Sequence, residues 1–142
     1  MEGIMRVDDF YNTAYSDIKL SPQIKKLPTL ERLKIFFVRV QMICIEQGDA
    51  YLRKTYLNGL KYPEWRILKT GPERTVYKII MEMLAQCREE GSITSILSDD
   101  EIFGQFVVVS RGLLVDWLIR LGEFDMKTMS ERSFEIMLNG LP

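Results

Sequence analysis

Residues 97–121 read LSDDEIFGQFVVVSRGLLVDWLIRL, and this stretch carries the clearest helix signals in the chain. Ser98 is a strong N-cap residue, and Glu101 three positions later completes a capping box. Leu97 and Ile102 flank this start with the spacing of a hydrophobic staple. These signals predict one long helix through the whole stretch.

Helical periodicity extends outward from this stretch, and six helices account for the chain. Thr29 is the expected N-cap of the second helix, which is apolar on most sides and should run through the middle of the domain. Asn58-Gly59 is the expected end of the third helix, and Pro72 suits the first turn of the fourth. No segment has a convincing strand pattern, so the expected fold is all-α, a compact bundle in a single domain over residues 1–142. The six helices are expected at about 4–18, 29–47, 49–58, 72–90, 98–121 and 125–139.

The last two predicted helices each have two apolar sides. A helix at the edge of a globular chain needs only one apolar stripe, so a second stripe requires another partner. Two such helices from each of two chains can form a dimeric four-helix bundle, in which both copies use the same patch. The alternative is that these second faces are covered within one chain. The expected interface residues are Val108, Val109, Gly112, Val115, Asp116, Ile119, Met126, Met129, Ser133, Ile136, Met137 and Gly140.

Composition is that of an ordinary globular protein, with 46% hydrophobic and 27% charged residues. The chain has no histidine, the most frequent general acid–base group and metal ligand. Cys44 and Cys87 fall in apolar helical patterns, which predicts inert thiols. No nucleophile elbow, phosphate-binding glycine loop or paired-cysteine metal motif appears. We therefore expect no enzyme activity, no metal site and no cofactor, and a cytoplasmic location.

Charge and hydropathy indicate neither nucleic acid nor membrane as a partner of this chain alone. The net charge is -1, which gives no sign of phosphate binding. Residues 1–78 contain 14 Lys and Arg against 9 Asp and Glu, so a basic first half could face DNA, although chance explains it equally well. The most apolar stretch, 106–121, is interrupted by Arg111 and Asp116 and is shorter than the roughly 20 residues of a membrane span.

Several short motifs follow one another along the chain: PTLERL at 28–33, GSI at 91–93, LSDDE at 97–101, SRGLL at 110–114, WL at 117–118, FD at 124–125 and IMLNGL at 136–141. Their order resembles that found in TetR-type bacterial transcription regulators. The set resembles the end of these regulators over about 75–142, and more loosely over 29–56. The resemblance implies a helical domain that dimerises through its last two helices. The chain lacks the family's helix-turn-helix segment, so DNA binding is expected only through a domain absent from it, with residues 1–18 as the linking helix.

The same resemblance implies an effector pocket among the middle helices, for a medium-sized, largely apolar small molecule. Apolar walls with a few orienting hydroxyl groups are typical of such pockets. For each candidate taken alone, core packing is the simpler explanation. The rival interpretation is a stand-alone helical adaptor or dimerisation protein that binds another protein, with a filled core and an exposed apolar groove. The expected ligand-binding residues are Phe36, Phe37, Val40, Ile43, Cys44, Tyr51, Tyr56, Tyr77, Met81, Phe103, Phe106 and Ser110.

Overall fold

The computed structural model of the chain describes residues 2–62 and 74–141. Within these ranges every regular element is a helix, which confirms the all-α prediction. The predicted helix start at Pro72 lies outside the described residues. The described helices are α1 (Glu2–Leu20), α2 (Pro22–Lys25), α3 (Thr29–Glu46), α4 (Asp49–Lys61), α6 (Thr75–Glu89), α7 (Asp99–Ile119) and α8 (Met126–Leu138).

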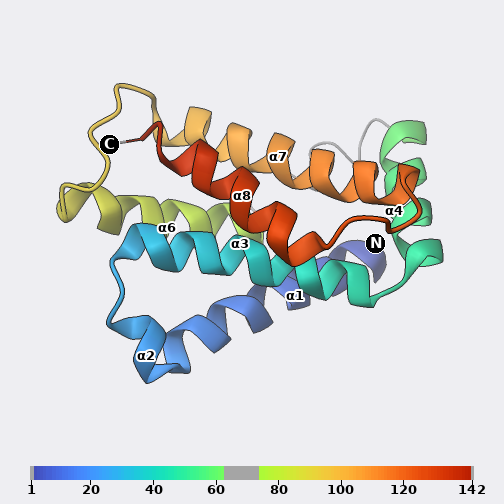
Figure 1. Ribbon diagram of the computed structural model, residues 1–142, viewed down its shortest axis with the longest axis horizontal. Coiled ribbons are helices and arrows are strands. Elements are labelled where there is room, and N and C mark those ends of the chain that lie inside the picture. The colour runs from blue at the N-terminus through green and yellow to red at the C-terminus, as the bar shows by residue number, and fades with distance from the viewer. Residues whose placement is uncertain (1, 63–73, 142) are drawn as a thin grey trace.

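Helix α3 runs through the middle of the bundle (Figure 1), where it contacts α1, α6, α7 and α8. Its buried side chains include Leu33, Phe36 and Phe37, and also Val40 and Cys44 in the later turns. These positions point in several directions around the helix axis, so little of α3 meets water. A helix that is apolar on most sides is stable only in such an interior position.

Three phenylalanines join α3, α7 and α8. The ring of Phe37 stacks on that of Phe106, with centroids 4.0 Å apart and planes at 12°, and on that of Phe134 at 4.8 Å and 27°. All three side chains are buried. Large buried rings dominate core energetics, and stacked pairs add to their burial. This cluster holds α7 and α8 side by side over α3 (Figure 1).

Local capping sets several helix ends. Ser98 Oγ accepts a hydrogen bond from the Glu101 N–H at 3.1 Å, and Asp125 Oδ2 accepts one from the Thr128 N–H at 3.1 Å. Gly91 follows the end of α6 with a φ of 77°, a conformation that glycine adopts without a Cβ penalty. The predicted helix starts at Ser98 and Asp125 and the predicted stop at Gly91 are therefore confirmed.

The predicted N-cap at Thr29 is wrong, because Pro28 occupies that position and Thr29 is the first residue of α3. The Thr29 side chain is fully buried, and its hydroxyl donates to a carboxylate oxygen of Glu90 just after α6. A tertiary hydrogen bond thus replaces the expected local one. Arg32 Nη2 also donates to the Thr29 hydroxyl, at 2.6 Å, and completes this junction between α3 and the end of α6.

Two further helix boundaries differ from the prediction. α4 continues through Gly59 to Lys61, because Gly59 keeps a negative φ and does not turn the chain. A short helix, α2, forms between the first two predicted helices, where no helix was predicted. Pro22 stands in its first turn, where a missing N–H costs nothing, and Ser21 Oγ accepts from the Ile24 N–H at 3.3 Å.

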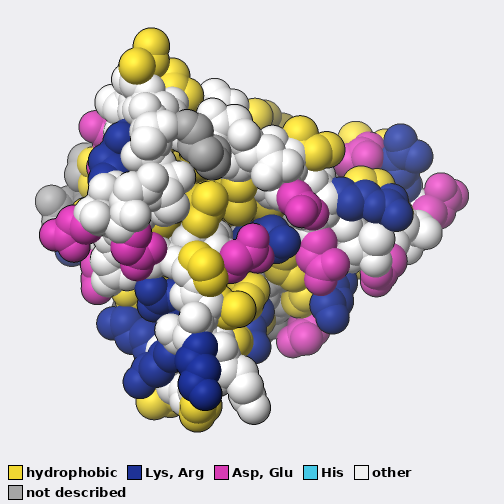
Figure 2. Space-filling view, turned by 60° about the vertical axis from the view of Figure 1, so that its left-hand side comes forward, with side chains coloured by type: hydrophobic (Ala, Val, Ile, Leu, Met, Phe, Trp, Pro, Cys, Tyr) yellow, Lys and Arg dark blue, Asp and Glu magenta, His cyan; other side chains and the backbone are white. Residues whose placement is uncertain are grey.

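The α1–α2 end of the molecule is basic. Figure 2 shows Lys and Arg side chains gathered at the lower end of the molecule, where Figure 1 places α2. Lys19, Lys25 and Lys26 are exposed there, beside Leu20, which is 78% exposed. The Lys19 ammonium lies 4.2 Å from the centroid of the Tyr15 ring, a cation–π arrangement that orders this end of α1.

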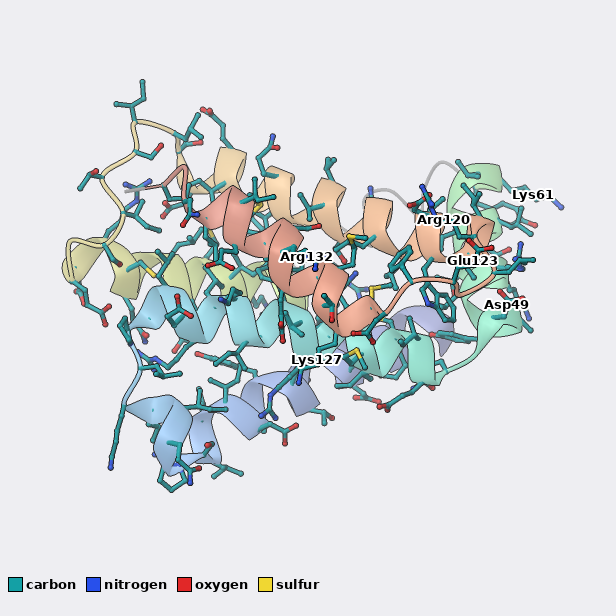
Figure 3. All side chains as sticks on the ribbon, viewed as in Figure 1. Asp49, Lys61, Arg120, Glu123, Lys127 and Arg132 are labelled. Carbon is teal, nitrogen blue, oxygen red and sulfur yellow. The ribbon has the colours of Figure 1, made fainter. Side chains whose placement is uncertain are left out.

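Helix α4 closes the opposite end of the bundle beside the end of α7. Arg53 Nη2 donates to the carbonyl oxygen of Leu118 at 3.0 Å, and this oxygen also accepts a hydrogen bond from the Leu121 N–H at 3.2 Å. The charged side chains of Lys61, Arg120 and Glu123 lie around this end (Figure 3). The end of α7 is thus held against α4.

Helix α7 is the one helix in the described ranges that is long and apolar enough, by length and composition alone, to cross a membrane. It spans 21 residues because it begins at Asp99, before the apolar stretch 106–121. The same helix packs against α3, α4, α6 and α8. Only 33% of its most apolar window is buried within the chain. A large part of its apolar surface therefore remains uncovered.

Candidate functional site

A cavity of about 90 Å³ lies between α1, α3, α4, α6 and α7. Aliphatic and aromatic side chains form most of its wall, with tyrosine, serine and threonine hydroxyls and two arginines among them. An engineered cavity of about 150 Å³ accommodates benzene, and ordinary ligand pockets occupy about 300–1,000 Å³. This cavity therefore has room for only a very small molecule.

The structure brings seven of the twelve expected ligand-binding residues to this cavity. They come from α3 and α4, which are consecutive in the sequence, and from α7, which lies about 40 residues further along, so the packing of the bundle brings α7 to the other two. The seven are Phe37, Val40 and Cys44 of α3, Tyr51 and Tyr56 of α4, and Phe106 and Ser110 of α7.

On α6, the cavity faces a different stripe from the one expected. Val76 and Ile80 line it, whereas the expected Tyr77 and Met81 do not. The two pairs differ by one position along the helix, which corresponds to a rotation of about 100°. The most apolar stripe of α6 thus faces the interior of the bundle, whereas Tyr77 and Met81 beside it are half-buried outside the cavity.

The remaining expected residues also lie elsewhere. Phe36 is fully buried in the core beside the cavity, and Ile43 is half-buried on α3. Phe103 packs edge to face with Tyr77 at 5.0 Å between centroids, and the Tyr77 hydroxyl donates to Asp100 Oδ1 at 2.7 Å. This pair joins α6 to the start of α7.

Sequence reasoning missed ten lining residues, of which the arginines matter most chemically. Arg74 stands at the N-cap of α6, and Arg111 lies in the middle of α7. α1 also contributes Phe10 and Tyr11, although it was assigned only to a linking role. Arg111 could have been predicted as a site residue from the sequence, because a charged residue within an apolar helix needs a partner or a function.

The cavity is rich in hydrogen-bond donors. Burial raises the pKa of Tyr11 and of Tyr56 far above the ordinary value of 10.0, so both phenols stay protonated near neutrality. Arg74 Nη2 donates to Asp8 Oδ1, and no described residue of the cavity wall is Asp or Glu. Phenols and guanidinium groups both donate hydrogen bonds. The polar part of the wall therefore suits an acceptor.

Ser110 is already engaged by a neighbour. Its hydroxyl donates to Gln41 Oε1 at 2.6 Å, and Gln41 Nε2 donates to the Ser110 carbonyl oxygen at 3.2 Å. Gln41 is fully buried, so these bonds satisfy a polar group that burial would otherwise destabilise. In this arrangement Ser110 Oγ can accept a hydrogen bond from a ligand, since its own proton is committed.

A second hollow, an open groove, lies on the outer surface between α7 and α8. Ile136 lines the groove and is 76% exposed. Val108 and Ile119 lie one helical turn from the lining residues Gly112 and Asp116, so they form the apolar rim, and they are 64% and 71% exposed. Six of the twelve expected interface residues line the groove, and Leu113 and Phe124 complete it. The six are Val109, Gly112, Asp116, Met129, Ser133 and Ile136.

The other expected interface residues divide into three groups. Val115, like Val108 and Ile119, is exposed on α7. Met137 is half-buried, and Gly140 is exposed just beyond the end of α8. Met126, by contrast, is 1% exposed and belongs to the core of the single chain.

Gly112 has no packing role within the described chain. A Cβ atom built at this position meets no atom within 4 Å, and its φ is not positive. Glycine in a helix interior costs roughly 0.5–1 kcal/mol relative to alanine, so it normally marks a close approach of another element. Nothing in the described part of the chain supplies that approach.

Among the residues that the structure describes, no group of three or more His, Cys, Asp or Glu side chains is placed to hold a metal ion. Cys44 and Cys87 are buried and form no disulfide, and burial raises the pKa of Cys87 above its ordinary value of 9.0. Comparison with models of protein families, with curated proteins and with solved structures gives no match to this chain. The resemblance to TetR-type regulators thus stays a prediction from sequence motifs.

Proposed function

We propose that the chain is the effector-sensing and homodimerisation domain of a TetR-type transcription regulator. A small molecule would bind in the cavity and modulate DNA binding by a domain outside this chain. The observation that carries the proposal is the position of α7, which borders both hollows. Phe106 and Ser110 line the cavity, whereas Val109, Gly112 and Asp116 line the groove. A ligand in the cavity would contact the helix to which a second copy binds.

The groove and its rim favour a second copy of this chain as the occupant. An isologous interface places the same residues on both sides of a two-fold axis, so each copy covers the apolar face of the other. Covering an aliphatic side chain contributes about 1.5–3 kcal/mol, and both copies would bury Val108, Ile119 and Ile136. Gly112 would let the two α7 helices approach closely.

The regulatory step would be a population shift. Phe10 and Tyr11 of α1 line the cavity, and α1 is the element that the resemblance assigns to the link with a DNA-binding domain. A ligand that prefers one arrangement of α1 would alter the spacing of two DNA-reading heads. The test uses a longer protein that carries both domains. An operator affinity that stays the same with every bound ligand would refute this step.

The size of the cavity limits what can bind without rearrangement. At about 90 Å³ it is smaller than the medium-sized effector expected from the resemblance would need. A larger ligand would require α1 or α4 to move outward. A broad ligand screen by thermal shift tests this, because a ligand that binds only the folded state raises the unfolding temperature. A screen without any stabilising compound would count against an effector site.

Oligomeric state tests the dimer. Light scattering over a concentration series should give twice the 16.6 kDa mass of the chain. Ile136→Glu should give a monomer, because it places a charge in the apolar interface. Leu20→Glu is the matched control, since Leu20 is 78% exposed against 76% for Ile136 but lies on α1. A monomeric unsubstituted chain, or an Ile136→Glu dimer, would refute the interface.

A second candidate function is an adaptor that binds another protein. The combination of an open α7–α8 groove and a small cavity favours it. Such a protein would be monomeric when purified, and its groove would bind an amphipathic helix of a different chain. A stable dimer with ligand-dependent unfolding would exclude it.

A further inference from the structure

The described part of the cavity wall is positively charged. Arg74 and Arg111 line it, and its described residues include no Asp or Glu. Asp8, outside the wall, forms an ion pair with Arg74. None of the ion pairs within the described residues includes Arg111. Arg74 is thus paired with Asp8, whereas Arg111 has no ion-pair partner among the described residues.

Neighbouring phenols place further donors at the same end. Burial raises the pKa of Tyr11, whereas the charges of Arg74 and Arg111 act on it in the opposite direction. Both guanidinium groups therefore lie within electrostatic range of the Tyr11 hydroxyl. A protonated phenol and a guanidinium group can both donate to one anion. Apolar side chains form most of the remaining wall.

We propose that the cavity binds a short-chain monocarboxylate, with its carboxylate at Arg111 and Tyr11 and its alkyl chain beside Val40, Ile80 and Leu114. This inference rests on the proposed effector function and narrows its ligand from an apolar molecule to an amphipathic acid. One arginine, Arg111, without an ion-pair partner among the described residues matches a monoanion. The cavity of about 90 Å³ admits only a small ligand, so a short chain of about four carbons is the expected size.

The probes are butanoate and butan-1-ol, which share an alkyl chain and differ in charge. Each is titrated into the isotope-labelled full chain at constant ionic strength and followed by protein NMR. Butanoate should shift the resonances of cavity residues and bind about tenfold or more tightly than butan-1-ol, because hydrogen bonds to charged groups are the stronger ones. Each methylene from acetate to butanoate should add about fourfold in affinity.

Substitutions assign the charge that is responsible. Arg111→Gln should weaken butanoate binding about tenfold and leave butan-1-ol binding unchanged, while Arg111→Lys should retain most of the butanoate affinity. Lys78→Gln is the matched control, because it removes an exposed positive charge from α6 outside the cavity. It should change neither affinity.

Equal affinities for butanoate and butan-1-ol, or full butanoate affinity in Arg111→Gln, would overturn the carboxylate assignment and leave an effector cavity for neutral molecules. A different result would overturn the effector function itself: no NMR shift at cavity residues with any ligand tested. The ligands for this test are the carboxylates from acetate to octanoate, the matching alcohols and the compounds of the thermal-shift screen. The two failures are therefore distinguishable.

Discussion

Replacing Gly112 by alanine should change the stability of the single chain and the strength of the dimer in opposite directions. Gly112 is exposed in the interior of α7, and an added Cβ would meet no atom of the described chain within 4 Å. Within one chain the substitution only improves helix propensity, which stabilises an exposed helix by about 1 kcal/mol. The free energy of unfolding of the monomer should rise by about that amount.

In a dimer packed at Gly112, the added methyl group enters a close contact. Overpacking costs typically 1–3 kcal/mol per site, and an isologous dimer contains the substitution twice. At about 1 kcal/mol per copy, the dimer dissociation constant should rise about 30-fold.

The assay combines urea unfolding at low protein concentration with light scattering over a dilution series. Gly59→Ala on α4 is the control, since its Cβ also meets no atom within 4 Å and it lies outside the groove. It should stabilise the chain without changing dissociation. A Gly112→Ala protein that is more stable and dimerises as strongly as the unsubstituted chain would refute close packing of α7 across the two-fold axis.

Two further predictions concern the core and one helix start. Phe37→Ala should destabilise the chain by about 3–5 kcal/mol in urea unfolding, because it removes both ring stacks and leaves a cavity. The control is Leu60→Ala, at an 84% exposed side chain, which should change the free energy of unfolding by less than about 0.5 kcal/mol. Equal losses of stability in the two variants would contradict the assigned core. Hydrogen bonds from the Thr128 hydroxyl and N–H lower the pKa of Asp125 below its ordinary value of 3.8. Its contribution to stability is therefore present above the unfolded-state value and is lost as the pH falls through the folded-state pKa. Asp125→Asn should flatten the pH dependence of unfolding in that acidic range, and an unchanged profile would show that the carboxylate cap contributes nothing.

The presence of the helices and several of their ends could be predicted from the sequence, because both depend on residues close to one another along the chain. The caps at Ser98 and Asp125 act on N–H groups three positions later, and Gly91 ends α6 through its own backbone dihedrals. Thr29 was misassigned because its partner, Glu90, is 61 positions away. A side chain with a choice between a local and a tertiary partner cannot be resolved from the local pattern.

The cavity was only half predictable for a related reason. Aromatic residues on α3, α4 and α7 were candidates because their types suit a pocket, and seven expected residues do line it. Which stripe of α6 faces inward depends on a rotation of about 100°, which separates Val76 and Ile80 from Tyr77 and Met81. Periodicity identifies an apolar side of a helix more reliably than it identifies the single row that borders an empty space.

Sequence by itself determined that this chain is all-helical, that α3 lies in its interior, and that α7 has more apolar surface than one chain needs, because helix period and composition carry that information locally. Tertiary structure alone decided that Arg74 and Arg111 border the same cavity from different helices. It also decided that α7 presents one face to this cavity and another to the groove beside α8. A cavity is the space that packed side chains from several elements fail to fill, so no segment of sequence contains it.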